Sequence, residues 1–79
     1  MIWQASEHSW IEIAAGNDHL AIIQTILGSG LSEGETAYEV DIIRKHDGAF
    51  VEHCDCPEWT SKDDAKLQAE ALLNKVEHA

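Results

Sequence analysis

The dipeptide Asp47-Gly48 separates two runs of residues that favour β-strands, 36–46 and 49–56. Asp-Gly between two such runs is typical of a two-residue type I′ turn, which joins neighbouring antiparallel strands. Pro57 ends the second run, because proline has no N–H to donate to the sheet. The sequence therefore predicts a β-hairpin in the second half of the chain.

A second hairpin is predicted upstream of the first. Residues 9–15 alternate apolar and polar side chains, and residues 19–27 are rich in β-branched side chains, with Gly16-Asn17-Asp18 between them. A two-residue and a three-residue loop would put opposite faces of the first strand beside Ile23, so the register stays open. Residues 28–35 contain three glycines and predict a loop between the hairpins.

The last segment predicts an α-helix. Thr60 or Ser61 can cap its start through a side-chain oxygen. At 100° per residue, five apolar side chains fall on one narrow face that would lie on a sheet. These are Ala65, Ala69, Leu72, Leu73 and Val76. The opposite side carries Asp63, Glu70 and Glu77, which we expect to face solvent.

These elements predict an α+β fold with the order ββββα. A four-stranded antiparallel meander sheet would carry one C-terminal helix on one face, in two layers. The 79 residues form a single domain, residues 1–79, since a chain of this length has no room for a second core. Small domains bury a modest apolar area, and homodimerisation is a common remedy.

Charge excludes several classes of function. The first 43 residues contain seven carboxylates and no lysine or arginine, and the whole chain has a formal charge of −10. Such a chain repels DNA, RNA and anionic lipid, so we expect neither direct nucleic-acid binding nor membrane binding. No apolar stretch approaches the roughly 20 residues that span a bilayer, and no signal peptide is predicted. The two cysteines, Cys54 and Cys56, predict free thiols and a cytoplasmic location.

The one string of metal-binding residue types is His53-Cys54-Asp55-Cys56. On a strand, the two thiols would face one way and His53 and Asp55 the other, so the four groups would not converge on one ion. No nucleophile elbow, phosphate loop or dinucleotide fingerprint is present. We therefore expect no metal, no cofactor and no enzymatic activity.

Side-chain alternation divides the second hairpin into two faces. A two-residue turn would pair Ile42 with His53 and Arg44 with Val51. The face expected to meet the helix collects Tyr38, Val40, Ile42 and Val51. The other face collects Glu39, Asp41, Ile43, Lys45, Phe50, Glu52, Cys54 and Cys56.

One helix covers only one face of a sheet, so the second face would be open to solvent or to a partner. Its mixture of carboxylates and apolar side chains suits a basic, partly apolar protein surface. We expect the partner-contact residues to be Glu39, Asp41, Ile43, Phe50 and Glu52. An ordinary solvated face with scattered apolar residues is the alternative interpretation.

The sequence thus favours a small acidic, non-catalytic protein-binding module. By analogy of charge and size with small acidic proteins of phages and mobile elements, it would dock on a basic partner and occlude a nucleic-acid site. The alternative function is a homodimeric structural or accessory protein that self-associates through the same open face. Neither the partner nor the biological process follows from the residues.

Overall fold

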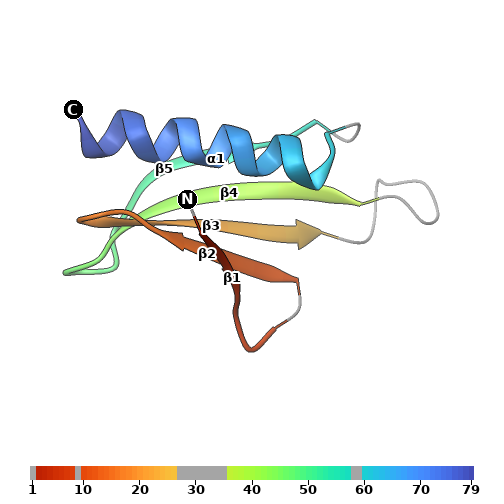
Figure 1. Ribbon diagram of the computed structural model, residues 1–79, viewed down its shortest axis with the longest axis horizontal. Coiled ribbons are helices and arrows are strands. Elements are labelled where there is room, and N and C mark those ends of the chain that lie inside the picture. Colours follow the sequence, from red (N-terminus) through yellow and green to blue (C-terminus); the bar gives the residue numbers. More distant parts are fainter. Residues whose placement is uncertain (1, 9, 27–35, 58–59) are drawn as a thin grey trace.

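A computed structural model describes residues 2–8, 10–26, 36–57 and 60–79 of the chain (Figure 1). It contains five strands and one helix. In chain order they are β1 (Trp3–Ala5), β2 (Ile11–Ala15), β3 (His19–Ile26), β4 (Ala37–Arg44), β5 (Phe50–Asp55) and α1 (Lys62–Glu77). The loop predicted at residues 28–35 lies outside the described residues.

The strands form one antiparallel sheet in the order β1-β2-β3-β4-β5, so each strand pairs with the next along the chain. Helix α1 lies across one face of this sheet, as Figure 1 shows. The predicted two-layer α+β fold is therefore confirmed, but the sheet has five strands and not four. The additional strand, β1, has three residues, which is too short for an alternating pattern to reveal it.

The core lies between α1 and the sheet. Its fully buried large side chains are Ile23 from β3, Val40 and Ile42 from β4, and Leu73 from α1. Ala65 and Ala69 are also buried, and these small side chains let the helix approach the strands closely. The predicted apolar face of the helix is confirmed. Within the described part of the chain, no helix is long and apolar enough to cross a membrane.

The helix begins as its sequence predicts. Ser61 is the N-cap, and its side-chain oxygen accepts a hydrogen bond from the Asp64 N–H at 3.1 Å. Asp63 and Asp64 stand in the first turn, where negative charge is favourable, and Lys75 stands in the last turn.

The first hairpin has a two-residue loop, Asn17-Asp18. The Gly16 N–H donates to the His19 carbonyl at 2.8 Å, and Ala15 pairs with Leu20. This register, which the sequence left open, places Ala14 and Ala21 under the helix.

The second hairpin differs from the prediction. Its loop has four residues, 45–48, since the Arg44 N–H donates to the Ala49 carbonyl at 2.9 Å. Gly48 closes the loop with φ +70°, a conformation that favours glycine. The predicted two-residue turn is wrong, and Lys45 belongs to the loop and not to the strand face.

A β-bulge changes the register again within the same hairpin. Ile43 pairs with Phe50 while Ile42 pairs with Glu52, which leaves Val51 as the extra residue. Because side chains alternate along a strand, a shift of one residue moves each of them to the other face. The predicted pairing of Ile42 with His53 is therefore wrong; His53 pairs with Asp41.

Candidate functional site

The face of the sheet opposite α1 is covered by no helix or strand in the described part of the chain, and we term it the open face (Figure 1). The strand registers arrange its side chains in three rows that run across β2, β3, β4 and β5. The first row is Ala15, Leu20, Ile43 and Phe50. The second is Ile13, Ile22, Asp41 and His53. The third is Ile11, Gln24, Glu39 and Asp55.

The apolar part of the open face is formed by the first row, by Ile13 and Ile22 of the second row, and by Ile11 of the third. Phe50 is 74% exposed although it is a large aromatic side chain. Ile2, which is 78% exposed, joins Ile13 and Leu20 around a shallow depression. Adjoining apolar side chains at a surface are typical of a contact site, whereas isolated ones are ordinary.

The acidic part of the open face lies on β4 and β5 and contains a histidine. We term Glu39, Asp41, His53 and Asp55 the His53 cluster. The His53 ring lies between two carboxylates: Nδ1 is 2.6 Å from Asp41 Oδ1, and Nε2 is 2.9 Å from Asp55 Oδ1. Hydrogen bonding to Asp41 and then to Asp55 raises the pKa of His53 above its ordinary value. A protonated imidazole donates from both nitrogens, which suits this arrangement.

The cluster has a surplus of negative charge. Glu39 and Asp55 are directly opposite on neighbouring strands, where like charges are unfavourable. Each lysine and arginine of the described residues contacts another group. Arg44 pairs with Asp47, Lys45 donates to the Gly16 carbonyl, Lys62 and Lys66 pair with Glu12, and Lys75 pairs with Glu52. The cluster therefore combines three carboxylates with a single imidazole.

The same residues include the one group in the described chain with metal-ligand geometry. Glu39, His53 and Asp55 each place one ligand atom within 4.8 Å of the others. Both ring nitrogens of His53 lie within hydrogen-bond distance of carboxylates, those of Asp41 and Asp55.

The cysteines do not take part in this group. Cys54 and Cys56 are free thiols, as predicted, but they face the helix and not the open side. Both sulfurs contact Gln68 Oε1 of α1, at 3.8 Å and 3.6 Å. Burial raises the pKa of the Cys56 thiol, which favours its protonated form.

Four of the five predicted contact residues lie on the open face: Glu39, Asp41, Ile43 and Phe50. The placement of Glu52 is wrong, because the bulge turns it toward α1, where Lys75 Nζ is 3.4 Å from its Oε1. His53 and Asp55 take its place. Sequence reasoning missed them because a hairpin without the bulge at Val51 puts both on the helix face.

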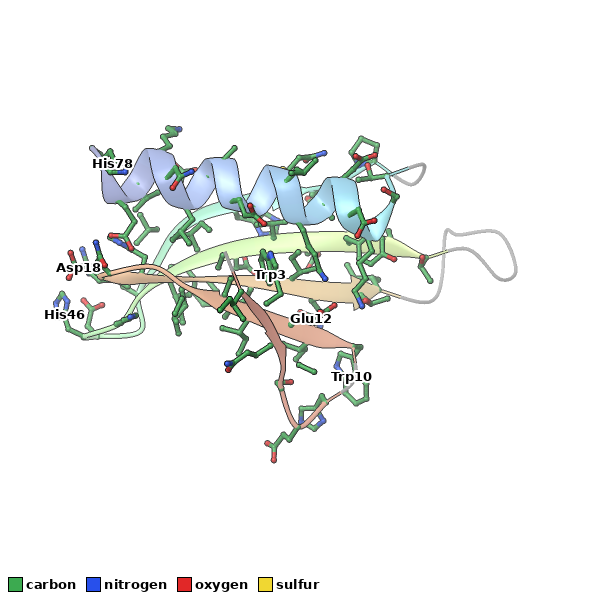
Figure 2. The ribbon with its side chains drawn as sticks, viewed as in Figure 1. Trp3, Trp10, Glu12, Asp18, His46 and His78 are labelled. Carbon is green, nitrogen blue, oxygen red and sulfur yellow. The ribbon has the colours of Figure 1, made fainter. Side chains whose placement is uncertain are left out.

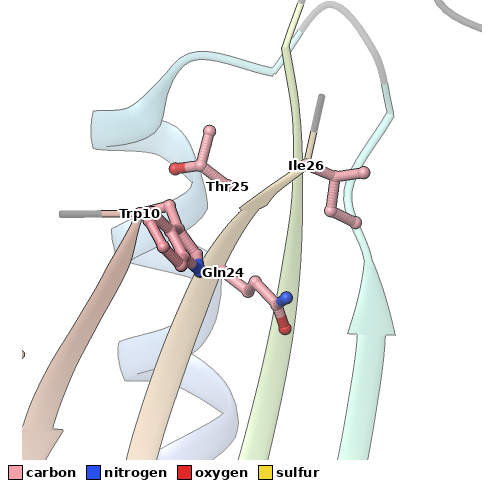
Figure 3. Close-up of a pocket in the computed structure, with 4 residues that line it drawn as sticks. All are labelled: Trp10, Gln24, Thr25 and Ile26. Carbon is pink, nitrogen blue, oxygen red and sulfur yellow. The ribbon is translucent and has the colours of Figure 1, made fainter. Parts of the chain in front are cut away.

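A second depression lies at the Ile26 end of β3. Trp10, Gln24, Thr25 and Ile26 line it (Figure 3). Trp10 is 48% exposed and stacks on the His8 ring, with ring centroids 4.7 Å apart. Among the residues that the structure describes, those that line this depression carry no titratable side chain.

Polar contacts on the other face join α1 to the sheet. The indole N–H of Trp3 donates to Glu70 Oε2 at 3.0 Å, and Lys62 and Lys66 pair with Glu12 (Figure 2). The Lys62 ammonium group holds the pKa of Glu12 below its ordinary value. Glu77 accepts hydrogen bonds from the backbone at Asp18 and His19. Glu70 and Glu77, expected to face solvent, therefore stabilise the fold.

No protein-family model matches this sequence, and no curated protein or solved structure matches it significantly. Functional inference therefore rests on the geometry of the open face.

Proposed function

We propose that this chain is a non-catalytic protein-binding module whose open face docks on a basic, partly apolar surface of another protein. The proposal rests on one observation: an apolar row and an acidic cluster lie next to each other on the uncovered face of the sheet. An apolar row ends in the exposed Phe50, and beside it the His53 cluster presents three carboxylates without a lysine or arginine. The free thiols suit a reducing compartment such as the cytoplasm.

The charge of the chain supports the same partner class. A formal charge of −10 attracts a basic protein over long range and gives fast, salt-sensitive association. Carboxylates that dock where phosphates would lie also exclude nucleic acid from the partner. The proposal therefore includes occlusion of a nucleic-acid site, which predicts that the module and the nucleic acid compete for the partner.

Two charge-matched triple variants test the proposal. The first, Glu39→Gln/Asp41→Asn/Asp55→Asn, removes the carboxylates of the His53 cluster. The control, Glu7→Gln/Glu52→Gln/Asp63→Asn, removes three charges that lie outside the His53 cluster. We expect tagged control protein to capture the same basic partner from lysate as the wild type, and the cluster variant to lose it.

The outcome that would contradict the proposal is equal capture by both triple variants. A partner that keeps its nucleic acid while bound to the module would refute the occlusion step alone.

The apolar part of the open face supports a second candidate, a homodimeric accessory protein. Phe50, at 74% exposure, would be covered by a second copy of the chain. Phe50→Glu would then convert a dimer to a monomer in analytical ultracentrifugation. A wild-type chain that sediments as a monomer at high concentration would rule this candidate out.

A further inference from the structure

Strand β5 lies at the edge of the sheet, and its outer backbone groups have no partner among the described residues. The strand order ends with β5, which pairs only with β4. The Cys56 N–H donates to the Tyr38 carbonyl at 3.0 Å, so the backbone groups of Cys56 face β4. Because backbone groups alternate in direction along a strand, the N–H and C=O of His53 and Asp55 face away from β4. These groups bond nothing in the described part of the chain.

The outer edge of β5 is accessible to another strand. Helix α1 packs mainly on β3 and β4 and leaves this edge uncovered. The side chains beside the unpaired backbone groups are exposed, His53 at 50% and Asp55 at 73%. The bulge at Val51 lies at the start of the strand, so residues 52–55 form its regular part. A regular edge with free N–H and C=O groups is a template for a further strand.

The charges along β5 suit pairing with a second copy in one register. Two copies can pair antiparallel about a twofold axis normal to the sheet, which keeps both helices on the same face. The residue beside the axis then opposes its own copy. An axis at Glu52, His53 or Asp55 would place like ionisable groups opposite each other, which is unfavourable. An axis at Cys54 places two neutral thiols opposite each other instead.

We propose that β5 pairs with β5 of a second copy about a twofold axis at Cys54, which joins the two sheets into one. In this register His53 opposes Asp55 of the second copy on both sides of the axis, and Glu52 opposes Cys56. The outward N–H groups of His53 and Asp55 donate to the carbonyls of the opposing residues. The inference goes beyond the proposed function and does not rest on it, because both open faces stay uncovered.

The net charge makes this association distinguishable from docking on a basic protein. Two copies that each carry a formal charge of −10 repel at long range. Salt screens this repulsion, whereas the backbone hydrogen bonds and close His53–Asp55 contacts are less affected. The dissociation constant of the dimer should therefore fall as the ionic strength rises, whereas binding to a basic protein weakens.

The direct test is oxidative cross-linking of the full chain with diamide, a thiol oxidant, in about 0.5 M salt. Opposing residues such as Cys54 and its copy have Cβ atoms about 4.5–5.5 Å apart, so a small strand adjustment permits a disulfide. Cys56 opposes Glu52 and has no thiol opposite it. We expect a disulfide-linked dimer from wild type and Cys56→Ser on non-reducing gels, and none from Cys54→Ser.

A second pair of variants tests the backbone pairing by sedimentation. Asp55→Pro removes an outward N–H that bonds nothing in the monomer, and proline is tolerated where an edge N–H faces solvent. Asp55→Asn removes the same charge and keeps the N–H. We expect the dimer of Asp55→Pro to be about tenfold weaker than that of Asp55→Asn. Phe50→Glu should leave this dimer intact, although it would break a dimer formed through the open face.

Three results would overturn the inference: a wild type that stays monomeric at high concentration and high salt, equal cross-linking of Cys54→Ser and Cys56→Ser, or equal dimerisation of folded Asp55→Pro and Asp55→Asn. The proposed function can fail separately. A β5-paired dimer that captures no basic protein would remove the proposed function alone, and a monomer that captures one would remove the dimer alone.

Discussion

The Glu77 carboxylate is the side chain through which the end of the helix is held to the first hairpin. It is only 10% exposed, and its oxygens accept from the Asp18 N–H at 3.1 Å and the His19 N–H at 3.3 Å. A Cβ added at Gly16 would lie 2.0 Å from Glu77 Oε1, so only glycine leaves room for this contact. One acidic side chain therefore fixes both the position of the helix end and the residue type of the turn.

Glu77→Gln should lower the melting temperature at neutral pH and weaken the dependence of stability on acid. Burial of Glu77 alone would raise its pKa, but the Asp18 and His19 hydrogen bonds outweigh this and hold the pKa below 4.5. The stabilisation is therefore complete above pH 4.5 and is lost as the pH falls through the lower folded value. Thermal melts across this pH range check the prediction, with the exposed Glu7→Gln as control.

Gly16→Ala should act through the same contact. The added methyl group displaces the Glu77 carboxylate, so this variant and Glu77→Gln should not be additive in a double-mutant cycle. Additive losses in melting temperature would show that Gly16 and Glu77 contribute independently.

At the scale of elements, the β4–β5 hairpin decides which side chains reach the open face. Gly48→Ala should cost about 1 kcal/mol of unfolding free energy, because alanine resists φ +70°. No atom lies within 4 Å of the position of the new Cβ, so the cost is conformational and not a clash. Gly48→Asn should cost less, since asparagine tolerates this region. Urea titrations measure both; an unchanged midpoint for Gly48→Ala would contradict the loop conformation.

The two sides of α1 should differ in how much their leucine side chains contribute to stability. Leu73→Ala should destabilise the protein by about 2–5 kcal/mol, because Leu73 is fully buried in a small core. Leu67 occupies the same helix but is 64% exposed, and Leu67→Ala should change stability by less than about 0.5 kcal/mol. Urea or thermal unfolding of the pair measures the difference, and equal effects would contradict the assignment of the helix face.

Helix α1 and the β4–β5 hairpin show which parts of the fold can be predicted from the sequence. The helix and its apolar face are predictable because the 3.6-residue period and the Ser61 cap act locally. The β5 face is not, because the bulge at Val51, which local propensity does not specify, reverses the face of the residues that follow it. Glu39, Asp41, Ile43 and Phe50 were therefore predicted on the open face, whereas His53 and Asp55 were missed.

At the scale of the whole molecule, the two faces of the sheet differ in what their side chains contact. The helix side supplies stability through its core and through polar contacts such as those of Glu77. The open face contributes exposed apolar area and an acidic cluster. This separation implies that open-face substitutions should change partner binding while leaving the melting temperature nearly unchanged.

The most direct test of the docking face is capture of the partner by two variants with the same added charge. Phe50→Glu puts a carboxylate into the apolar part of the open face, and Leu67→Glu puts one on the exposed side of α1. We predict that wild type and Leu67→Glu retain the same basic protein, and that folded Phe50→Glu loses it. Equal retention by all three proteins would contradict the claim that the open face is the docking surface.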